Sequence, residues 1–296
     1  MRHESEITIA VVGDVHDLWE REDGIALARL GVDLVLFVGD FGNEAVEVVR
    51  QIAAVETPKA VVMGNHDAWY SASSWGRQKA PYDQKIEDRV QQQLDLLGKD
   101  HVGFSKLDFD NLALSVVGSR PFSWGGSTWR NGQFYHDRYN VKSFAESTRQ
   151  IVTSAQNTAY DNVVIIGHNG PFGLGDKTES ICGRDWKPEG GDYGDPDLQS
   201  AIAQIRNLGK SIPLVTFGHM HHALKHPFGK RRTIINVKDD IVYFNAACVP
   251  RVIKSDRVSK RSFSLVSLQQ GKVKEISLVW LDSDFKLDSE EIVYSH

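Results

Sequence analysis

The sequence near the N-terminus reads ITIAVVGDVH (residues 7–16), an apolar run that ends in glycine and is followed at once by Asp14 and His16. Four later segments repeat this order. Short runs rich in Val, Ile and Leu are typical of buried strands, and glycine lets the chain turn sharply where each strand ends. The four segments are DLVLFVGD (33–40), KAVVMGNHD (59–67), NVVIIGH (162–168) and IPLVTFGHMH (212–221).

These five turns predict a single binding edge. Open α/β sheets build their sites at the carboxyl ends of the strands, and every turn carries a side chain that binds metals well. Residues i and i+2 of an extended chain point to the same side, so Asp14 and His16 are expected to share one ion. The predicted edge collects Asp14, His16, Asp40, Asn65, His66, His168, His219 and His221.

Composition narrows the class of protein. The chain has 296 residues, of which 41% are hydrophobic, so it can bury a full core. Two cysteines are too few for a disulfide framework and indicate a reducing compartment. The charged start MRHESE lacks the features of a secretory signal, and no apolar run approaches the ~20 residues of a membrane span. We therefore expect a cytoplasmic protein with no membrane partner.

The net charge of −5 makes nucleic acid an unexpected partner, because a phosphate-backbone footprint needs a basic surface. The sequence shows no repeats, low-complexity tracts or linker, so residues 1–296 are predicted to form a single domain. Alternating strands and helices predict parallel strands flanked by helices, followed by antiparallel hairpins. The expected strands cover 7–13, 33–39, 59–64, 101–107, 112–118, 162–167, 212–217, 233–237, 241–246, 262–268 and 273–281. The expected helices cover 23–30, 44–53, 83–97, 142–159 and 196–207.

The ordered set GDVH, GDFGN, GNHD, GH and GHMH resembles the signature of the calcineurin-like metallophosphoesterases. The resemblance spans Ile7 to Ala247, and the ordered combination is far more specific than any single piece. It implies an α/β fold in which two mixed β-sheets pack face to face and are flanked by helices. It also implies a phosphoric ester hydrolase.

The resemblance further implies a dinuclear site with Asp40 as the bridging ligand. The mixed nitrogen and oxygen donors suit two divalent transition-metal ions. We expect Mn²⁺, with Fe, Zn, Co or Ni as alternatives. A hydroxide bridging the ions would be the nucleophile. The first ion would be held by Asp14, His16, Asp40 and His221, and the second by Asp40, Asn65, His168 and His219.

By the same resemblance, His66 is the general acid that protonates the leaving group. It follows Asn65 in a segment expected to be extended, so the two side chains should face apart. Asp67 is expected either to orient a histidine or to cap the next turn.

One departure from the family is informative. Protein serine/threonine phosphatases of this superfamily carry GDxxDRG, where the second Asp supports the histidine and the Arg grips phosphate. Here Asn43 and Glu44 stand at those two positions. An acid at position 44 would repel phosphate if it pointed inward. The pattern therefore indicates a member that acts on a small phosphorylated substrate, or a divergent member, rather than a protein phosphatase.

Substrate contacts are expected from three loops, at 68–82, 119–140 and 169–195, because long loops are often binding loops or lids. Aromatics beside arginines could stack a base or sugar and hold a second phosphate. The alternative is that these loops pack their own aromatics onto the sheet. The candidate substrate-binding residues are Trp69, Arg120, Trp124 and Arg251.

The predicted function is hydrolysis of a small phosphate ester, with monoesters ahead of diesters. One alternative is a phosphodiesterase acting on nucleotides or dinucleotides, favoured if the aromatic loops form a base slot; a nuclease is disfavoured by the acidity of the chain. An alternative of another class is a catalytically silent regulatory module that keeps the metal site for structure. The sequence does not indicate the oligomeric state.

Overall fold

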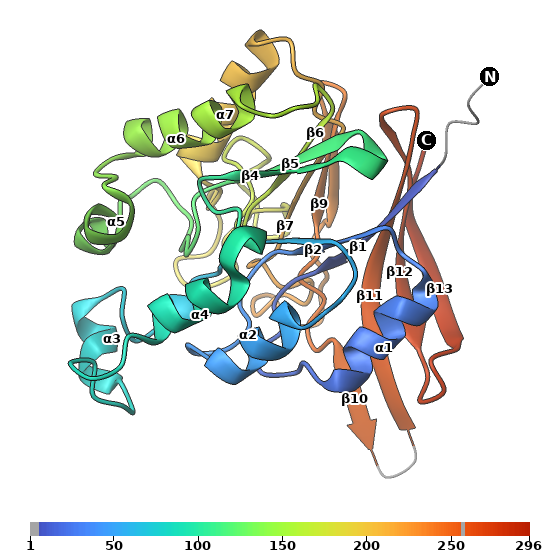
Figure 1. Cartoon of the computed structure of the whole chain (residues 1–296), viewed down its shortest axis with the longest axis horizontal. Helices are drawn as coiled ribbons and strands as arrows, with labels where there is room; N and C mark the ends of the chain where they lie inside the picture. The colour runs from blue at the N-terminus through green and yellow to red at the C-terminus, as the bar shows by residue number, and fades with distance from the viewer. Residues whose placement is uncertain (1–5, 256–257) are drawn as a thin grey trace.

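The computed structural model describes residues 6–255 and 258–296. Two mixed β-sheets pack face to face, with helices outside each sheet (Figure 1). This architecture confirms the predicted fold class. The helices are α1 (Arg21–Leu30), α2 (Val46–Ala53), α3 (Ser74–Lys79), α4 (Arg89–Leu97), α5 (Gly132–Tyr139), α6 (Phe144–Gln156) and α7 (Pro196–Asn207).

The first sheet joins the N-terminal strands to the C-terminal hairpins. Its strands are β1 (Ile7–Val12), β2 (Leu34–Phe37), β3 (Lys59–Val61), β10 (Val252–Ser255), β11 (Val258–Gln269), β12 (Lys272–Leu281) and β13 (Leu287–Ser295). Their order is β13–β12–β11–β1–β2–β3, with β10 beside β11. β1, β2 and β3 run parallel, while β11 is antiparallel to β1. The parallel part therefore lies where the first three glycine turns occur.

The second sheet has a parallel centre as well. Its strands are β4 (Lys106–Phe109), β5 (Leu114–Gly118), β6 (Val163–Ile166), β7 (Leu214–Phe217), β8 (Ile235–Lys238) and β9 (Ile241–Asn245). Their order is β4–β5–β6–β7–β9–β8, and β5, β6, β7 and β9 run parallel to one another. The last two glycine turns follow β6 and β7, at the centre of this sheet.

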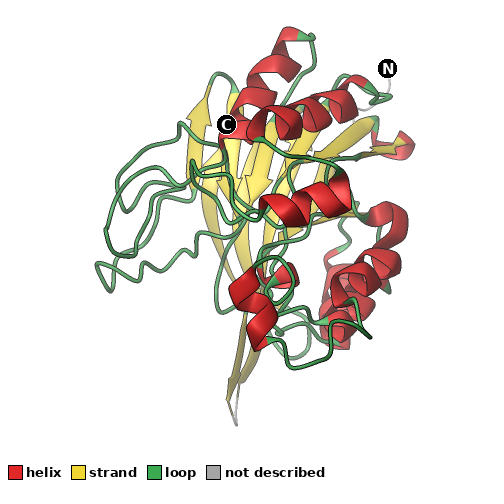
Figure 2. Cartoon of the chain, turned by 90° about the vertical axis from the view of Figure 1, so that its left-hand side faces the viewer, coloured by secondary structure: helices red, strands yellow, loops and turns green. Residues whose placement is uncertain are grey.

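Burial on both faces explains the continuous apolar runs of the central strands. In β6, Val164 and Ile166 face the core between the two sheets, while Val163 and Ile165 face the core under α6 and α7. Alternating side chains of one strand thus serve two cores, which leaves no polar face. Figure 1 shows α6 and α7 on one side of the molecule and α1, α2 and α4 on the other. Long loops extend together from one edge of the sheets (Figure 2).

Several element boundaries differ from the predictions. The helix expected over 83–97 begins only at Arg89, because the Asp88 side chain caps it by accepting a hydrogen bond from the Gln91 backbone. The strand expected near 101–107 covers Lys106–Phe109. The helices α3 and α5 and the strands β10 and β13 were not predicted. β13 escapes prediction because it is a largely exposed, acidic edge strand with no apolar periodicity.

Among the described residues, no helix is long and apolar enough to cross a membrane. Residues 1–5, on which the expectation about a secretory signal partly depends, lie outside the described part of the chain.

Candidate metal centre and its pocket

The five glycine turns meet at one edge of the two sheets, and there they bring the predicted ligands together. Possible ligand atoms form three overlapping groups, and within each group the atoms lie within 4.8 Å of one another. The groups are Asp14, His16 and His221; His16, Asp40 and His66; and Asp40, His168 and His219.

One half of the cluster surrounds His168, which is fully buried. Its Nε2 lies 3.2 Å from Asp40 Oδ1 and 2.9 Å from Asn65 Oδ1. The Nδ1 of His219 lies 3.2 Å from the same Nε2. These four residues are the set predicted for the second ion.

The other half surrounds Asp14. The Nε2 of His221 lies 3.4 Å from Asp14 Oδ1 and 3.1 Å from the Nε2 of His16. Asp40 shares a group with His16 as well as with His168, so it occupies the position between the two halves. Asp40 is therefore the carboxylate that lies within reach of ligand atoms from both halves.

The donor set fits divalent transition metals, because it mixes imidazole nitrogens with carboxylate and amide oxygens. His168 Nδ1 donates to the Val38 carbonyl at 2.8 Å, which turns Nε2 toward the cluster, as in many metal sites. Burial lowers the pKa of His168, but Asp40 and Asp14 outweigh it and raise the value to about 9. Burial, followed by His168, lowers the pKa of His219 to about 3. The cluster thus favours a positive charge beside Asp40, which a metal ion would supply in place of the proton.

The turns that carry these ligands have unusual backbone conformations. Asp14, His16, Asp40 and His219 have φ values of 50°, 45°, 58° and 67°. The extended chain predicted around Asp14 and His16 is therefore wrong, although both side chains do reach one group. Asp and His tolerate the left-handed region better than branched residues do, and cross-turn hydrogen bonds hold it here. Asp14 N donates to the Gly39 carbonyl at 3.0 Å, and His16 N donates to the Asp40 carbonyl at 2.9 Å.

Asp67 fastens the β2 turn to the β3 turn. Its carboxylate accepts hydrogen bonds from the backbone N–H groups of Asp40 (3.0 Å), Phe41 (2.8 Å) and Gly64 (2.6 Å). Burial and Asp40 raise the pKa of Asp67, while these donors favour its charged form. The turns approach so closely that a Cβ on Gly39 would lie 2.4 Å from the Gly64 nitrogen. Asp67 therefore holds two ligand turns together, a role the sequence did not indicate.

His66 lies beside the cluster and faces the pocket. Its Nδ1 lies 2.6 Å from Asn43 Oδ1, so the ring donates a hydrogen bond to that amide oxygen, and its Nε2 lies 3.9 Å from Asp40 Oδ2. The segment is not extended as predicted, since His66–Ala68 forms a 3-10 turn. Burial lowers the pKa of His66, and Asp40 only partly offsets this. Asn43 therefore orients the ring as a carboxylate would, but without adding charge.

Glu44 does not face the site. It is fully buried and accepts hydrogen bonds from the backbone of Tyr70 (2.9 Å) and Ser71 (2.7 Å) and from the Tyr82 hydroxyl. Burial raises the pKa of Glu44. The Glu44 carboxylate thus holds the 68–82 loop by hydrogen bonds and does not line the pocket.

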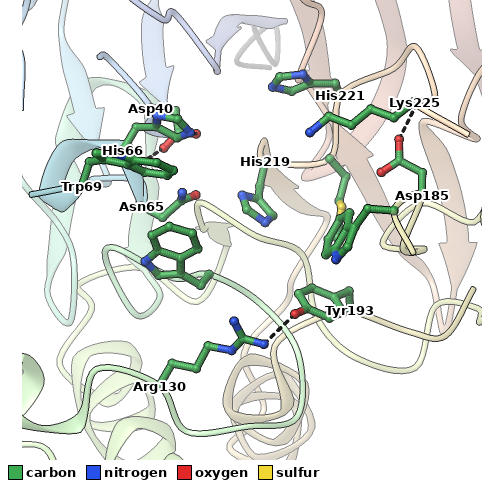
Figure 3. Close-up of a pocket in the computed structure, with 13 residues that line it drawn as sticks. Asp40, Asn65, His66, Trp69, Arg130, Asp185, Tyr193, His219, His221 and Lys225 are labelled. Atoms are coloured by element: carbon green, nitrogen blue, oxygen red, sulfur yellow. Dashed lines mark hydrogen bonds and ion pairs between the residues drawn. The ribbon is translucent and has the colours of Figure 1, made fainter. Parts of the chain in front are cut away.

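A pocket of about 310 Å³ opens in front of the ligands, and all three predicted loops line it (Figure 3). The pocket-lining residues of these loops are Trp69 from 68–82, Trp124 and Arg130 from 119–140, and Asp185, Trp186 and Tyr193 from 169–195. Met220 and Lys225 complete the walls and were not predicted. Lys225 carries no local sequence signal except that it closely follows His221.

Two predicted substrate contacts need correction, because both arginines are buried in ion pairs and neither lines the pocket. The Nη2 of Arg120 lies 2.7 Å from Asp195 Oδ1, and its Nε lies 2.8 Å from Asp197 Oδ2. The Nη2 of Arg251 lies 2.9 Å from Asp23 Oδ1. Arg120 ties the loop after β5 to the start of α7, and Arg251 ties the loop before β10 to α1.

Solved structures of other proteins are similar to this chain. A protein of Thermus thermophilus has a solved structure with a TM-score of 0.50 and 11% sequence identity, and the match covers 98% of this chain and 100% of that chain. A dimetal phosphatase from Danio rerio gives a TM-score of 0.48 and 11% identity, covering 98% of this chain and 99% of that chain. At these identities the likeness concerns the fold alone. No curated protein matches the sequence.

A family model described as calcineurin-like phosphoesterase matches residues 7–223, a range that includes every predicted metal ligand from Asp14 to His221. The match extends over well more than half of the chain. The protein therefore belongs to the calcineurin-like phosphoesterase family.

Proposed function

We propose that this protein hydrolyses small phosphate esters with the help of two divalent transition-metal ions. Mn²⁺ is our first candidate for these ions. The observation that carries the proposal is the meeting of two half-sites at Asp40, directly below a pocket into which His66 projects. Asp14, His16, Asp40 and His221 would hold one ion; Asp40, Asn65, His168 and His219 would hold the other.

The two ions, when bound, would supply positive charge that binds and polarises a phosphoryl group and lowers the pKa of water. Asp14 and Asp40 offset about two of the four positive charges, and Asn65 adds none. A surplus of about +2 would therefore remain to attract a phosphate dianion. The neutral amide at position 65 supports phosphate binding more than a third carboxylate would.

His66 would donate the proton that the leaving group needs. Its Nδ1 is tied to Asn43, so only Nε2 is directed toward the pocket. In the imidazolium form, Nε2–H can donate to an oxygen leaving a phosphate held at the ligands. This pairing supports an enzyme over a silent regulatory module, because a metal site kept only for structure needs no oriented proton donor.

The size of the pocket and the two substituted positions support a small substrate. A volume of about 310 Å³ is at the lower end for small-molecule sites. The β2 turn offers Asn43 and Glu44 in place of the carboxylate and arginine of the protein phosphatases, and Glu44 is turned into the protein. We place monoesters ahead of diesters.

The test is a screen of phosphomonoesters, phosphodiesters and phosphopeptides with Mn²⁺-loaded protein, with Asp40→Asn as the matched inactive variant. We expect turnover of small esters that needs added metal and is lost in Asp40→Asn. Turnover that persists in this variant, or no turnover of any ester by protein with two bound ions, would refute the proposal.

A further inference from the structure

One wall of the pocket is a stack of three rings that begins at the proposed proton donor. Trp69 lies nearly parallel to His66, with centroids 4.5 Å apart and planes at 17°. Trp124 lies nearly parallel to Trp69, at 5.2 Å and 25°. All three rings line the pocket in front of the metal ligands. A leaving group protonated by His66 would therefore have a flat aromatic surface beside it.

The opposite wall is aromatic too, and the fold holds it in place. Trp186 stands edge-on to Tyr193, with centroids 4.7 Å apart. The Tyr193 carbonyl accepts hydrogen bonds from Asn169 Nδ2 and from Gly126 N, both at 2.8 Å. A Cβ on Gly125 would lie 2.5 Å from the Tyr193 carbonyl oxygen, so glycine is needed where these two loops meet. Figure 3 shows Tyr193 across the pocket from the His66 side. The Tyr193 wall is thus held by contacts within the fold, and such preorganisation favours tight binding in the slot between the two walls.

Two cations complete the slot. Arg130 donates to the Tyr193 hydroxyl at 2.9 Å, and Lys225 lies near His221 at the metal end (Figure 3). Within residues 6–255 and 258–296, neither side chain forms an ion pair with a carboxylate. The Asp185 carboxylate beside them is already engaged, since it accepts from the Lys225 backbone at 2.7 Å and lies 3.6 Å from the Arg232 guanidinium. Both cations are therefore available to an anionic ligand.

We propose that this pocket selects phosphate esters of the nucleotide class. A planar ring of the leaving group lies between the stack of Trp69 and Trp124 and the wall of Trp186 and Tyr193. A second anionic group, such as a further phosphoryl group, lies beside Arg130. The inference rests on the proposed function, because the ester phosphate is taken to lie at the metal ligands.

The combination of rings and cations distinguishes this class from other small esters. A sugar phosphate has no planar ring to place between two aromatic walls. A simple aryl phosphate such as phenyl phosphate has a ring but no second anion for Arg130. Base–aromatic stacking tolerates any base, so the geometry points to nucleotides without choosing among the bases.

Calorimetry on Mn²⁺-loaded protein tests the ring slot. Methylene diphosphonate and α,β-methylene adenosine diphosphate carry the same hydrolysis-resistant phosphorus–carbon group and differ by the nucleoside. We expect the nucleoside analogue to bind at least about tenfold more tightly than methylene diphosphonate.

The variant Trp186→Leu should reduce this preference roughly fivefold or more. The control variant Trp280→Leu, in β12, should leave the preference unchanged. Trp186 is the better target because Trp124 is stacked, through Trp69, on His66. Equal affinity for the two ligands, or a preference that survives Trp186→Leu, would overturn the proposal.

Arg130 needs a control for its bond to Tyr193. Arg130→Gln should weaken binding of the nucleoside analogue roughly fivefold or more, because charge-assisted hydrogen bonds to phosphoryl oxygens are the strong ones. Tyr193→Phe removes the same internal hydrogen bond but keeps the ring and the cation, and should have a smaller effect. Equal losses in the two variants would refute the role of Arg130 in holding an anion.

These results separate the subsite from the reaction. Ring preference in calorimetry, without turnover of any ester, would keep the subsite and refute the proposed hydrolysis. Turnover of small esters without any ring preference would keep the hydrolysis and refute the subsite.

Discussion

Replacing Asn43 with Asp should raise the pKa of His66 and extend activity to higher pH. The two residues already touch, since His66 Nδ1 lies 2.6 Å from Asn43 Oδ1. Asp is isosteric with Asn, so the contact is kept while a negative charge is added. A carboxylate beside the ring stabilises the imidazolium, which is the form that donates a proton.

The size of the shift follows from the surroundings of the pair. An opposite charge at this distance moves a pKa by ~1–3 units in partly buried sites. Asn43 is exposed and the His66 side chain is 29% exposed, so screening favours the lower end. We therefore expect the alkaline limb of the kcat/KM profile to move up by about 1 unit, which is about 1.4 kcal/mol. Above the wild-type limb, the variant should be faster by up to about tenfold.

The assay is kcat/KM against pH for an alkyl phosphate, with metal content measured on the same samples. Gln92→Glu is the matched control, because it adds the same charge on the exposed face of α4. Nitrophenyl phosphate should show a smaller shift, since its leaving group hardly needs a proton. An alkaline limb that stays in place with both metals bound, or that moves equally in Gln92→Glu, would refute the assignment of proton donation to His66 and Asn43.

Four other predictions concern the metal centre and the core. His66→Asn should keep both ions but lose ~10²–10⁴-fold in rate on alkyl phosphates and much less on nitrophenyl phosphate; loss of an ion in elemental analysis would make His66 a ligand instead. Reconstituted protein should hold close to two ions, and Asp40→Asn should lose more metal than Asp14→Asn; equal losses would contradict a bridging Asp40. Arg120→Met should lower the free energy of unfolding in urea by roughly 3–5 kcal/mol, because it leaves the buried carboxylates of Asp195 and Asp197 without their ion-pair partner. Changing Asp195 and Asp197 to asparagine in the same variant should recover much of this loss. Unchanged stability of Arg120→Met together with weaker substrate binding would restore Arg120 as a substrate contact. In metal-free protein, the pKa of His168 is raised from 6.5 to about 9, so its stabilising effect is fully present below pH 6.5 and is lost as the pH rises through about 9; the Tm of chelated protein should fall across this window more than that of metal-loaded protein.

The meeting of the candidate metal ligands could be predicted because it obeys a rule of topology. Parallel strands bring their carboxyl ends to one edge, so Asp14 and His221 meet although they come from opposite ends of the matched region. The local argument for Asp14 and His16 was nevertheless wrong, because their backbone is left-handed and not extended. Strand ends fix where a turn begins, whereas the conformation inside the turn depends on cross-turn hydrogen bonds that a single segment does not reveal.

Charged residues in loops were the least predictable part of the site. Arg120 follows β5 and looks like a phosphate contact in the sequence, but its partners Asp195 and Asp197 come 75 and 77 residues later. A sequence gives the charge of a loop residue without giving its burial. Trp186 and Lys225 present the opposite case, since they line the pocket but have no motif around them.

The two substituted positions after β2 change where phosphate recognition must come from. Asn43 orients His66 by a hydrogen bond, as an aspartate would, but it carries no negative charge. Glu44 points into the protein and binds the backbone of the 68–82 loop. The β2 turn therefore offers no cation to a substrate. The cations that line the pocket are Arg130 and Lys225, which come from the loop after β5 and the segment after β7. Both segments follow strands of the second sheet. Under the proposed function, the metal motifs would govern whether a phosphate ester is cleaved, and the residues of the 119–140 and 169–195 loops that line the pocket would govern which ester is chosen.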